Sequence, residues 1–141
     1  MDWNDTDPAF VIGNGTGTSD RSNAFEVRKD GQVSVNGGVV HASDKRLKEN
    51  IEELPYGIEE ILQLKPVTYN WKRYPENGRH IGLIAQEVKD VLPELVETGN
   101  SEQQYLHLDY TNIIPVLING LKELKAENDE LKARIEVLEA E

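Results

Sequence analysis

Ser43 and Lys48 are the two residues in this sequence whose side chains could carry out covalent chemistry together. A serine hydroxyl becomes a nucleophile when a base removes its proton, and a lysine amine can be that base if burial lowers its pKa. On a regular helix a five-residue offset places two side chains about 140° apart, so they would not face each other. A bend that puts Ser43 just before a helix and Lys48 in its first turns would bring them together. The spacing equally fits a structural interpretation, in which Ser43 caps a helix and Lys48 is a solvated charge.

The pair follows a segment, residues 1–40, that is rich in Gly, Asn, Asp, Ser and Thr. Asp30-Gly31 and Asn36-Gly37 are strong hairpin signals. Each predicted strand carries only two or three apolar side chains, too few to bury a core alone. The segment could be a disordered leader, a β-meander, or strands that complete a core with copies of themselves in an oligomeric fibre, and we favour the last. The predicted strands cover residues 9–12, 24–28 and 32–35.

Residues 43–112 combine helical and strand patterns, which predicts an α+β unit. Leu47, Ile51 and Leu54 have a helical spacing, and the simplest expectation for Tyr69 and Trp71 is a place in the core. The predicted helices cover residues 44–54, 58–64 and 85–91, and the predicted strands cover residues 66–71 and 80–84.

The C-terminal residues 113–141 contain a heptad repeat, which predicts a parallel coiled coil. Glu127 with Lys132, and Arg134 with Glu139, are placed to pair between neighbouring parallel helices. Leucine at d with an asparagine at a is familiar from dimers, whereas isoleucine at a with leucine at d permits other strand numbers. The a positions are Ile114, Leu121, Asn128 and Ile135, and the d positions are Leu117, Leu124, Leu131 and Leu138.

The composition excludes several classes of function. A net charge of −11 argues against binding to nucleic acid or to an anionic membrane. The absence of cysteine excludes disulfides and thiolate chemistry, and no apolar run reaches the roughly 20 residues that span a bilayer. His80 and His107 have no partners at metal-ligand spacing, so we expect no metal and no cofactor. The acidic N-terminus has no apolar signal-peptide core.

Four motifs in order closely resemble the intramolecular chaperone auto-processing domain. This family forms the C-terminal domain of phage endosialidases, tailspikes and long tail fibres, and also occurs in a eukaryotic membrane-bound transcription factor. The resemblance covers about residues 43–130, and the glycine-rich segment before it looks like the last stretch of a β-structured fibre. The motifs are SDKRLKENI at 43–51, LKPVTYNW at 64–71, GLIAQEV at 82–88 and LPELV at 92–96.

The resemblance implies that Ser43 is the nucleophile and Lys48 the general base of a Ser–Lys dyad. The scissile bond would then be Ala42–Ser43, cut once per chain by a self-cleaving serine endopeptidase. Asp44, Gln86 and Glu87 could support the site. For Asp44 the structural alternative is a helix N-terminus, and for the other two a solvated position on an amphipathic helix. His41 could tune the site, although a place on the fibre face is the simpler expectation for it.

Taken together, these features predict an α+β homotrimer with three segments in each chain. The resemblance implies a chaperone that trimerises a phage tail fibre or tailspike and then releases itself. Its partners would be its own copies and the upstream fibre, and it would be a virion fibre precursor processed in the host cytoplasm. The alternatives are a trimerisation foldon that never cuts and a receptor-binding fibre tip. The segments are a fibre-stalk end at 1–42, the auto-processing domain at 43–112 and the coiled coil at 113–141.

Overall fold

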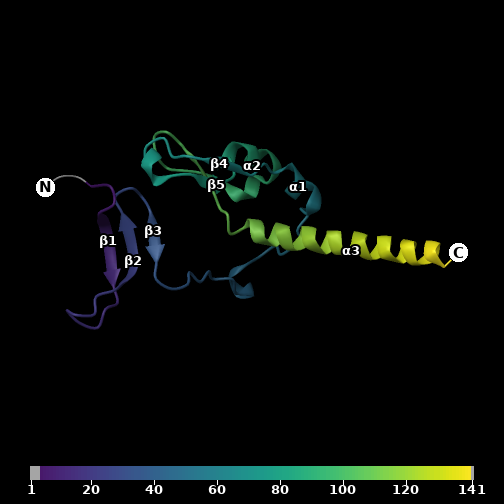
Figure 1. Cartoon of the computed structure of the whole chain (residues 1–141), viewed down its shortest axis with the longest axis horizontal. Helices are drawn as coiled ribbons and strands as arrows, with labels where there is room; N and C mark the ends of the chain where they lie inside the picture. Colours follow the sequence, from purple (N-terminus) through teal and green to yellow (C-terminus); the bar gives the residue numbers. More distant parts are fainter. Residues whose placement is uncertain (1–3, 141) are drawn as a thin grey trace. The chain divides into compact units, whose positions relative to one another are not determined.

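The computed structural model describes residues 4–140, and the chain divides into two units, Met1–Ile51 and Glu52–Glu141. In the part of the chain that the structure describes, the regular elements of the first unit are strands and a short 3-10 turn, whereas the second combines helices with short strands (Figure 1). The predicted α+β class and the C-terminal helix are therefore confirmed. Residues 1–3 and 141, at the ends of the predicted first and third segments, lie outside the described residues.

The first unit is built on a three-stranded antiparallel sheet in the order β1-β2-β3. All three predicted strands are present. Asp30-Gly31 turns the chain between β2 and β3, and Gly31 has a φ of 85°, a conformation that glycine adopts without steric cost. The strands are β1 (Pro8–Gly13), β2 (Asn23–Arg28) and β3 (Val33–Val35).

One face of this sheet is apolar and largely uncovered. The register pairs Phe10 with Val27 and Ile12 with Phe25, so these side chains share a face. Phe10 packs against Phe25 edge to face with ring centroids 6.3 Å apart, yet Phe10 remains more than half exposed. Within residues 4–51, this apolar layer therefore has no second layer packed over it.

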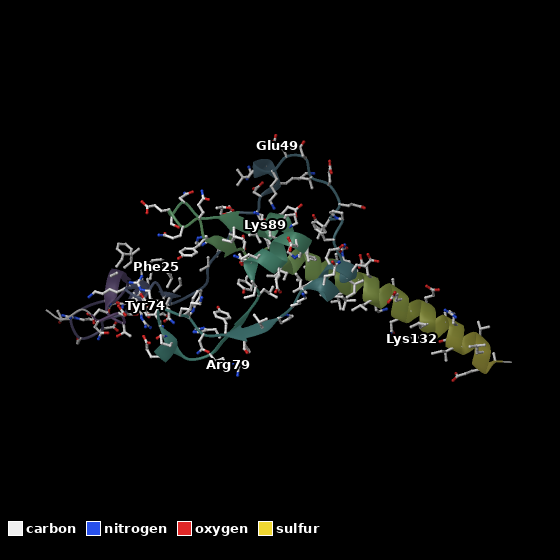
Figure 2. All side chains as sticks on the ribbon, turned by 90° about the horizontal axis from the view of Figure 1, so that it is seen from above. Phe25, Glu49, Tyr74, Arg79, Lys89 and Lys132 are labelled. Carbon is white, nitrogen blue, oxygen red and sulfur yellow. The ribbon has the colours of Figure 1, made fainter. Side chains whose placement is uncertain are left out.

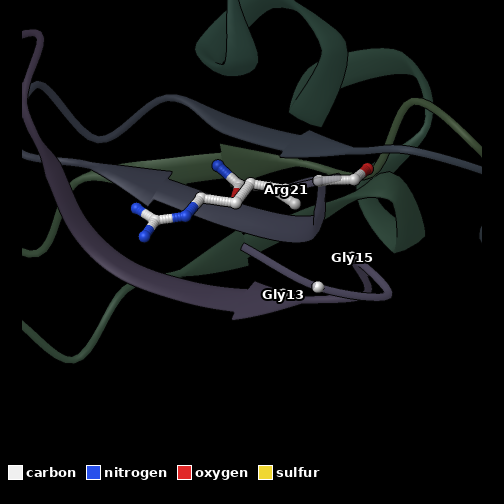
Figure 3. Close-up of a pocket in the computed structure, with 6 residues that line it drawn as sticks. Gly13, Gly15 and Arg21 are labelled. Atoms are coloured by element: carbon white, nitrogen blue, oxygen red, sulfur yellow. The ribbon is translucent and has the colours of Figure 1, made fainter. Parts of the chain in front are cut away.

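The loop between β1 and β2 is shaped by glycine. A Cβ added at Gly15 would collide with the backbone of Asp20 and Arg21. The close return of the loop leaves a shallow depression (Figure 3). It is lined by Gly13, Gly15, Gly17, Arg21, Ser22 and Asn23.

The helix predicted over residues 44–54 is wrong. Only Lys45–Leu47 form a 3-10 turn, and Lys48 already has an extended backbone with φ −124° and ψ 146°. Leu47 is 73 % exposed and Ile51 60 % exposed, so the apolar side chains that suggested a helix pack against nothing in their own unit. Without burial of an apolar face a short helix is not stable in water. Figure 2 shows Glu49 on a stretch of chain without regular structure.

The second unit alternates short helices with two antiparallel hairpins, β4–β5 and β6–β7. The first hairpin and both short helices lie where the sequence predicts them, but β6 and β7 were not predicted. Its elements are α1 (Ile58–Gln63), β4 (Val67–Tyr69), η2 (Pro75–Asn77), β5 (His80–Gly82), α2 (Ala85–Val91), η3 (Pro93–Leu95), β6 (Val96–Thr98), β7 (Leu106–Leu108) and α3 (Ile113–Glu139).

The core of the second unit is small. Four apolar side chains are fully buried among the described residues, and they come from α2, η3, the residue between them and the start of α3. Tyr56 closes one side of this core, and its hydroxyl donates to the Glu94 carboxylate at 2.9 Å. That hydrogen bond is the main reason why the pKa of Tyr56 is raised. The four buried residues are Val88, Leu92, Leu95 and Val116.

The first turns of α3 hold α1 and the segment that precedes it. Asn119 donates from Nδ2 to the Tyr56 carbonyl at 2.7 Å, and the Glu123 carboxylate accepts from the Ile58 N–H at 2.7 Å. Gly120 lies buried between these two residues, where a Cβ would stand 2.5 Å from Ile61 Cδ1 and 3.3 Å from Ile58 N. The missing side chain is what allows α1 to approach α3 so closely.

The expectation that Trp71 lies in the core is wrong. Trp71 is 53 % exposed and follows β4, where its ring meets Tyr69 edge to face at 5.3 Å. Tyr69 is half-buried and stacks on His80 across the hairpin with ring centroids 5.6 Å apart. The hairpin therefore holds an aromatic cluster at its own surface.

We expect Gly120→Val to destabilise the second unit by about 1 to 3 kcal/mol, because the added methyl groups would force Ile58 and its backbone away from α3. Ala126→Val is the matched control, since it adds the same branched carbon at an exposed position of α3 and should cost less than about 1 kcal/mol. Urea unfolding of the full chain at several protein concentrations, followed by circular dichroism, measures both. Equal losses in the two variants would contradict the assigned role of Gly120.

Candidate functional site

Ser43 and Lys48 meet in the first unit. Lys48 Nζ donates to Ser43 Oγ at 2.8 Å, a normal hydrogen-bond distance. The contact is made without a regular helix. Ser43 stands before the 3-10 turn, and Lys48 follows it with an extended backbone. The bend that the spacing requires is thus a single tight turn, and the two side chains lie on the same side of it.

Asp44 and Arg46 close this turn. The Asp44 carboxylate accepts from the Arg46 backbone N–H at 2.9 Å, as an N-capping side chain does. The Arg46 side chain returns to the same carboxylate through Nε, at 3.0 and 3.2 Å from its two oxygens, and through a terminal nitrogen at 2.7 Å. The hydrogen bonds from Arg46, the side-chain ones first, lower the pKa of Asp44, and Asp44 raises the pKa of Arg46. In the structural interpretation of the sequence, Asp44 lies at a helix N-terminus and Ser43 is the cap, whereas Asp44 is the residue that caps the 3-10 turn. The part played by Arg46 was not predicted.

All residues from His41 to Asn50 are exposed in the single chain. Ala42, on the N-terminal side of the bond predicted to be cut, therefore presents its peptide group to solvent together with the serine and the lysine. Within residues 4–140, Lys48 has no carboxylate at ion-pair distance. The hydrogen bond to Ser43 is its polar contact.

Gln86 and Glu87 belong to the second unit. Both are exposed on α2, and Glu87 borders a narrow pocket between α2 and the end of α1. Their support of the serine therefore stays a prediction, and so does a tuning role for His41. Among residues 4–140 no three His, Asp or Glu side chains are placed to hold a metal ion together. Over the same range, no helix has the length and apolar character needed to cross a bilayer.

A second candidate site is the exposed apolar stripe on α3, which we call the seam. Val116 and Gly120 face the core of their own unit, whereas the a and d positions of the heptad face away from it. Leu121 is 68 % exposed and Leu138 70 % exposed. Figure 1 shows the C-terminal half of α3 extending beyond the rest of the second unit, and Figure 2 shows its side chains, Lys132 among them, surrounded by open space. The seam comprises Ile114, Leu117, Leu121, Leu124, Asn128, Leu131, Ile135 and Leu138.

The charges beside the seam are also available. The ion pair found inside α3 joins Lys125 to Asp129. Within the described residues, Glu127, Lys132 and Arg134 form no ion pair in the single chain. They remain free for partners on a neighbouring helix.

Residues 43–97 match the profile of a peptidase family described as "Chaperone of endosialidase". The match begins at Ser43, the residue that the sequence predicts as the nucleophile. It also includes Lys48, the 3-10 turn and the two helices α1 and α2.

Curated relatives fall into two groups. Myelin regulatory factor homolog 1 of Caenorhabditis elegans is 30 % identical over 135 residues, which are 89 % of this chain and 14 % of that protein. Long tail fiber protein Gp37 of Escherichia phage AR1 is 36 % identical over 78 residues, covering 51 % of this chain and 7 % of that protein. The Gp37 protein of Enterobacteria phage M1 is 31 % identical over 119 residues, covering 77 % of this chain and 47 % of that protein.

The chain spans less than half the length of each of these relatives. The likeness is thus to part of longer proteins. The family profile places its match in this chain at residues 43–97, which contain the four ordered motifs. Residues 43–97 of this chain form a domain of the chaperone-of-endosialidase family, an intramolecular chaperone domain that follows directly on Ala42.

Proposed function

We propose that this chain is the C-terminal end of a trimeric phage tail fibre or tailspike. Residues from Ser43 onward would assemble the fibre and then release themselves by cutting the Ala42–Ser43 bond. The observation that carries the proposal is the 2.8 Å contact between Lys48 Nζ and Ser43 Oγ at the residue where the family match begins. The long tail fibre relatives support a place in a virion fibre. Processing would take place in the host cytoplasm, before the particle is released.

The cut follows from the tethered position of the hydroxyl. As a neutral amine, Lys48 Nζ takes the hydroxyl proton of Ser43 while Oγ attacks the carbonyl carbon of Ala42. The bond from that carbon to the Ser43 nitrogen breaks, the nitrogen receives a proton, and Ala42 is left as an ester on Oγ. Water then hydrolyses the ester, giving a carboxylate at Ala42 and a free amine at Ser43. Because nucleophile and carbonyl are neighbours in one chain, no entropy of encounter is lost.

Assembly supplies what the single chain lacks. An exposed lysine amine is stabilised as an ammonium ion by water, whereas removal of water favours the neutral form that can accept a proton. Ser43 and Lys48 are both exposed in the single chain. Covering Ser43 and Lys48 with neighbouring chains would favour the neutral amine that can act as the base. Cutting would then follow trimerisation rather than precede it.

The seam of α3 is the proposed trimerisation element. Burying an apolar side chain such as leucine contributes about 1.5 to 3 kcal/mol, and three parallel helices would bury the whole stripe at once. Joining the chains in register also removes the loop-closure entropy that slows the folding of intertwined β-structure. The uncovered apolar face of the β1–β2–β3 sheet fits the same scheme, as the end of a stalk in which three sheets cover one another.

We expect Ser43→Ala to leave an assembled but uncut chain, because Oγ is the attacking atom. Denaturing electrophoresis and mass spectrometry of freshly expressed protein should show 141 residues in this variant. The wild type should give fragments of 42 and 99 residues, the longer one beginning at Ser43. Ser101→Ala, an exposed serine of the second unit, is the control and should cut normally. An uncut but assembled wild type would leave only the trimerisation foldon, and a 43–141 segment that stays on the mature fibre would favour a receptor-binding tip.

We expect Lys48→Met to slow cutting by about 100-fold or more, since a positioned general base contributes on that scale. The substitution keeps the length of the side chain and removes the amine. Lys45→Met is the matched control, because Lys45 lies in the same turn and makes no contact with Ser43. The rate is the appearance of the 99-residue fragment per assembled chain. Equal rates for the two variants would remove Lys48 as the base.

We expect Leu124→Asp combined with Leu131→Asp to abolish both trimerisation and cutting, because each places a charge in the seam. Ala126→Asp combined with Ala133→Asp introduces the same charges on the opposite face of α3 and should leave both intact. Sedimentation analysis gives the oligomeric state and electrophoresis gives the cut fraction. Cutting by a demonstrated monomer would contradict the dependence on assembly.

A further inference from the structure

The turn between the serine and the lysine is held by a side-chain pair that the reaction itself does not use. Asp44 enters the turn with φ −64° and ψ 134°, and its carboxylate binds both the backbone and the side chain of Arg46. The turn is three residues long, so a small opening of it would move Lys48 Nζ away from Ser43 Oγ. A guanidinium that grips both carboxylate oxygens fixes a geometry better than a single hydrogen bond does.

The Asp44–Arg46 pair also concerns the charge near the amine, because Asp44 is the acidic residue that opens the turn leading to Lys48. An unpaired carboxylate within a few ångströms of a lysine stabilises the ammonium form and so opposes its use as a base. Here the Asp44 carboxylate is engaged by Arg46 at 2.7 Å, and Lys48 contacts Ser43 instead. The other titratable side chains of this exposed segment are His41, Lys45 and Glu49, and none of them forms an ion pair with Lys48.

We propose that Arg46 is a positioning residue for self-cleavage, which closes the turn on Asp44 and keeps that carboxylate off Lys48. The inference rests on the proposed function. It adds to that function a residue that keeps the Lys48 amine available as the base. Asp44 is the residue through which Arg46 closes the turn. It supports the site through Arg46 and not by contact with the lysine.

The test compares rate against pH in full-length chains. Each variant is diluted from urea into buffers from about pH 6 to about pH 10, a range in which an amine whose pKa is lowered by burial changes from ammonium to free base. The rate is that of the 99-residue fragment per assembled chain. For Arg46→Leu we expect the midpoint of the profile to move to higher pH, and the rate below that midpoint to fall on the order of tenfold.

A compensating variant separates electrostatics from folding of the turn. Asp44→Asn keeps an oxygen that can cap the turn but removes the charge, so Arg46→Leu with Asp44→Asn should return the midpoint to its wild-type position. Arg46→Lys keeps the charge without the two-pronged grip, so the midpoint should stay near the wild type while the rate falls. Lys45→Met removes a neighbouring unpaired charge and should shift the midpoint less than Arg46→Leu.

Two outcomes would overturn the inference. One is a wild-type midpoint in Arg46→Leu, whatever its rate, and the other is a midpoint that Asp44→Asn fails to restore. Failure of the proposed function has a different signature, because the assembled wild type would then give no fragment beginning at Ser43 under any condition.

Discussion

The single chain leaves much of its apolar surface exposed to water. This exposure is the physical constraint on which the rest of the structure depends. Among the described residues, four apolar side chains are buried, while the sheet of the first unit and the seam of α3 expose many more. Soluble monomers rarely leave such continuous apolar surface open to water. Under the proposed function, further copies of the chain would cover these surfaces, and stability and registration would be gained in the same event. The exception is the small core of the second unit, where α1, α2 and the start of α3 already close around Val116.

The chemistry obeys the same constraint. Ser43 and Lys48 are brought into contact by a turn of three residues, yet both remain in water in the single chain. Proximity comes from local sequence, and under the proposed function the assembly would supply the dry surroundings that a lysine base requires. Such a division would protect the nascent chain, because a premature cut would separate the fibre from the segment that aligns it.

Much of the fold could be predicted from the sequence where local chemistry decides the structure. Asp30-Gly31 specified a hairpin, and the heptad spacing specified α3, because turn residues and helical periodicity act over a few residues. The prediction of a helix over 44–54 was wrong because Leu47 and Ile51 remain exposed and gain nothing from helix formation. The prediction that Trp71 lies in the core was wrong because aromatic residues also gather at surfaces. Strands β6 and β7 were missed although Leu106, His107 and Leu108 alternate, since three residues are too short a signal. The Ser43–Lys48 contact depends on a bend in the chain, and the spacing of the two residues alone does not predict one. The contact between Asp44 and Arg46 was not predicted because a two-residue offset matches no helical periodicity.

The two halves of α3 differ in their contacts with the rest of the second unit. In the half nearer its start, one side anchors α1 through Asn119, Gly120 and Glu123 while the opposite side belongs to the seam. Beyond Glu123 the anchoring ends and only the stripe continues. The distal turns could therefore be exchanged for another helix with the same heptad phase. The proximal turns contact α1 on one side and carry the seam on the other, so fewer substitutions are tolerated there.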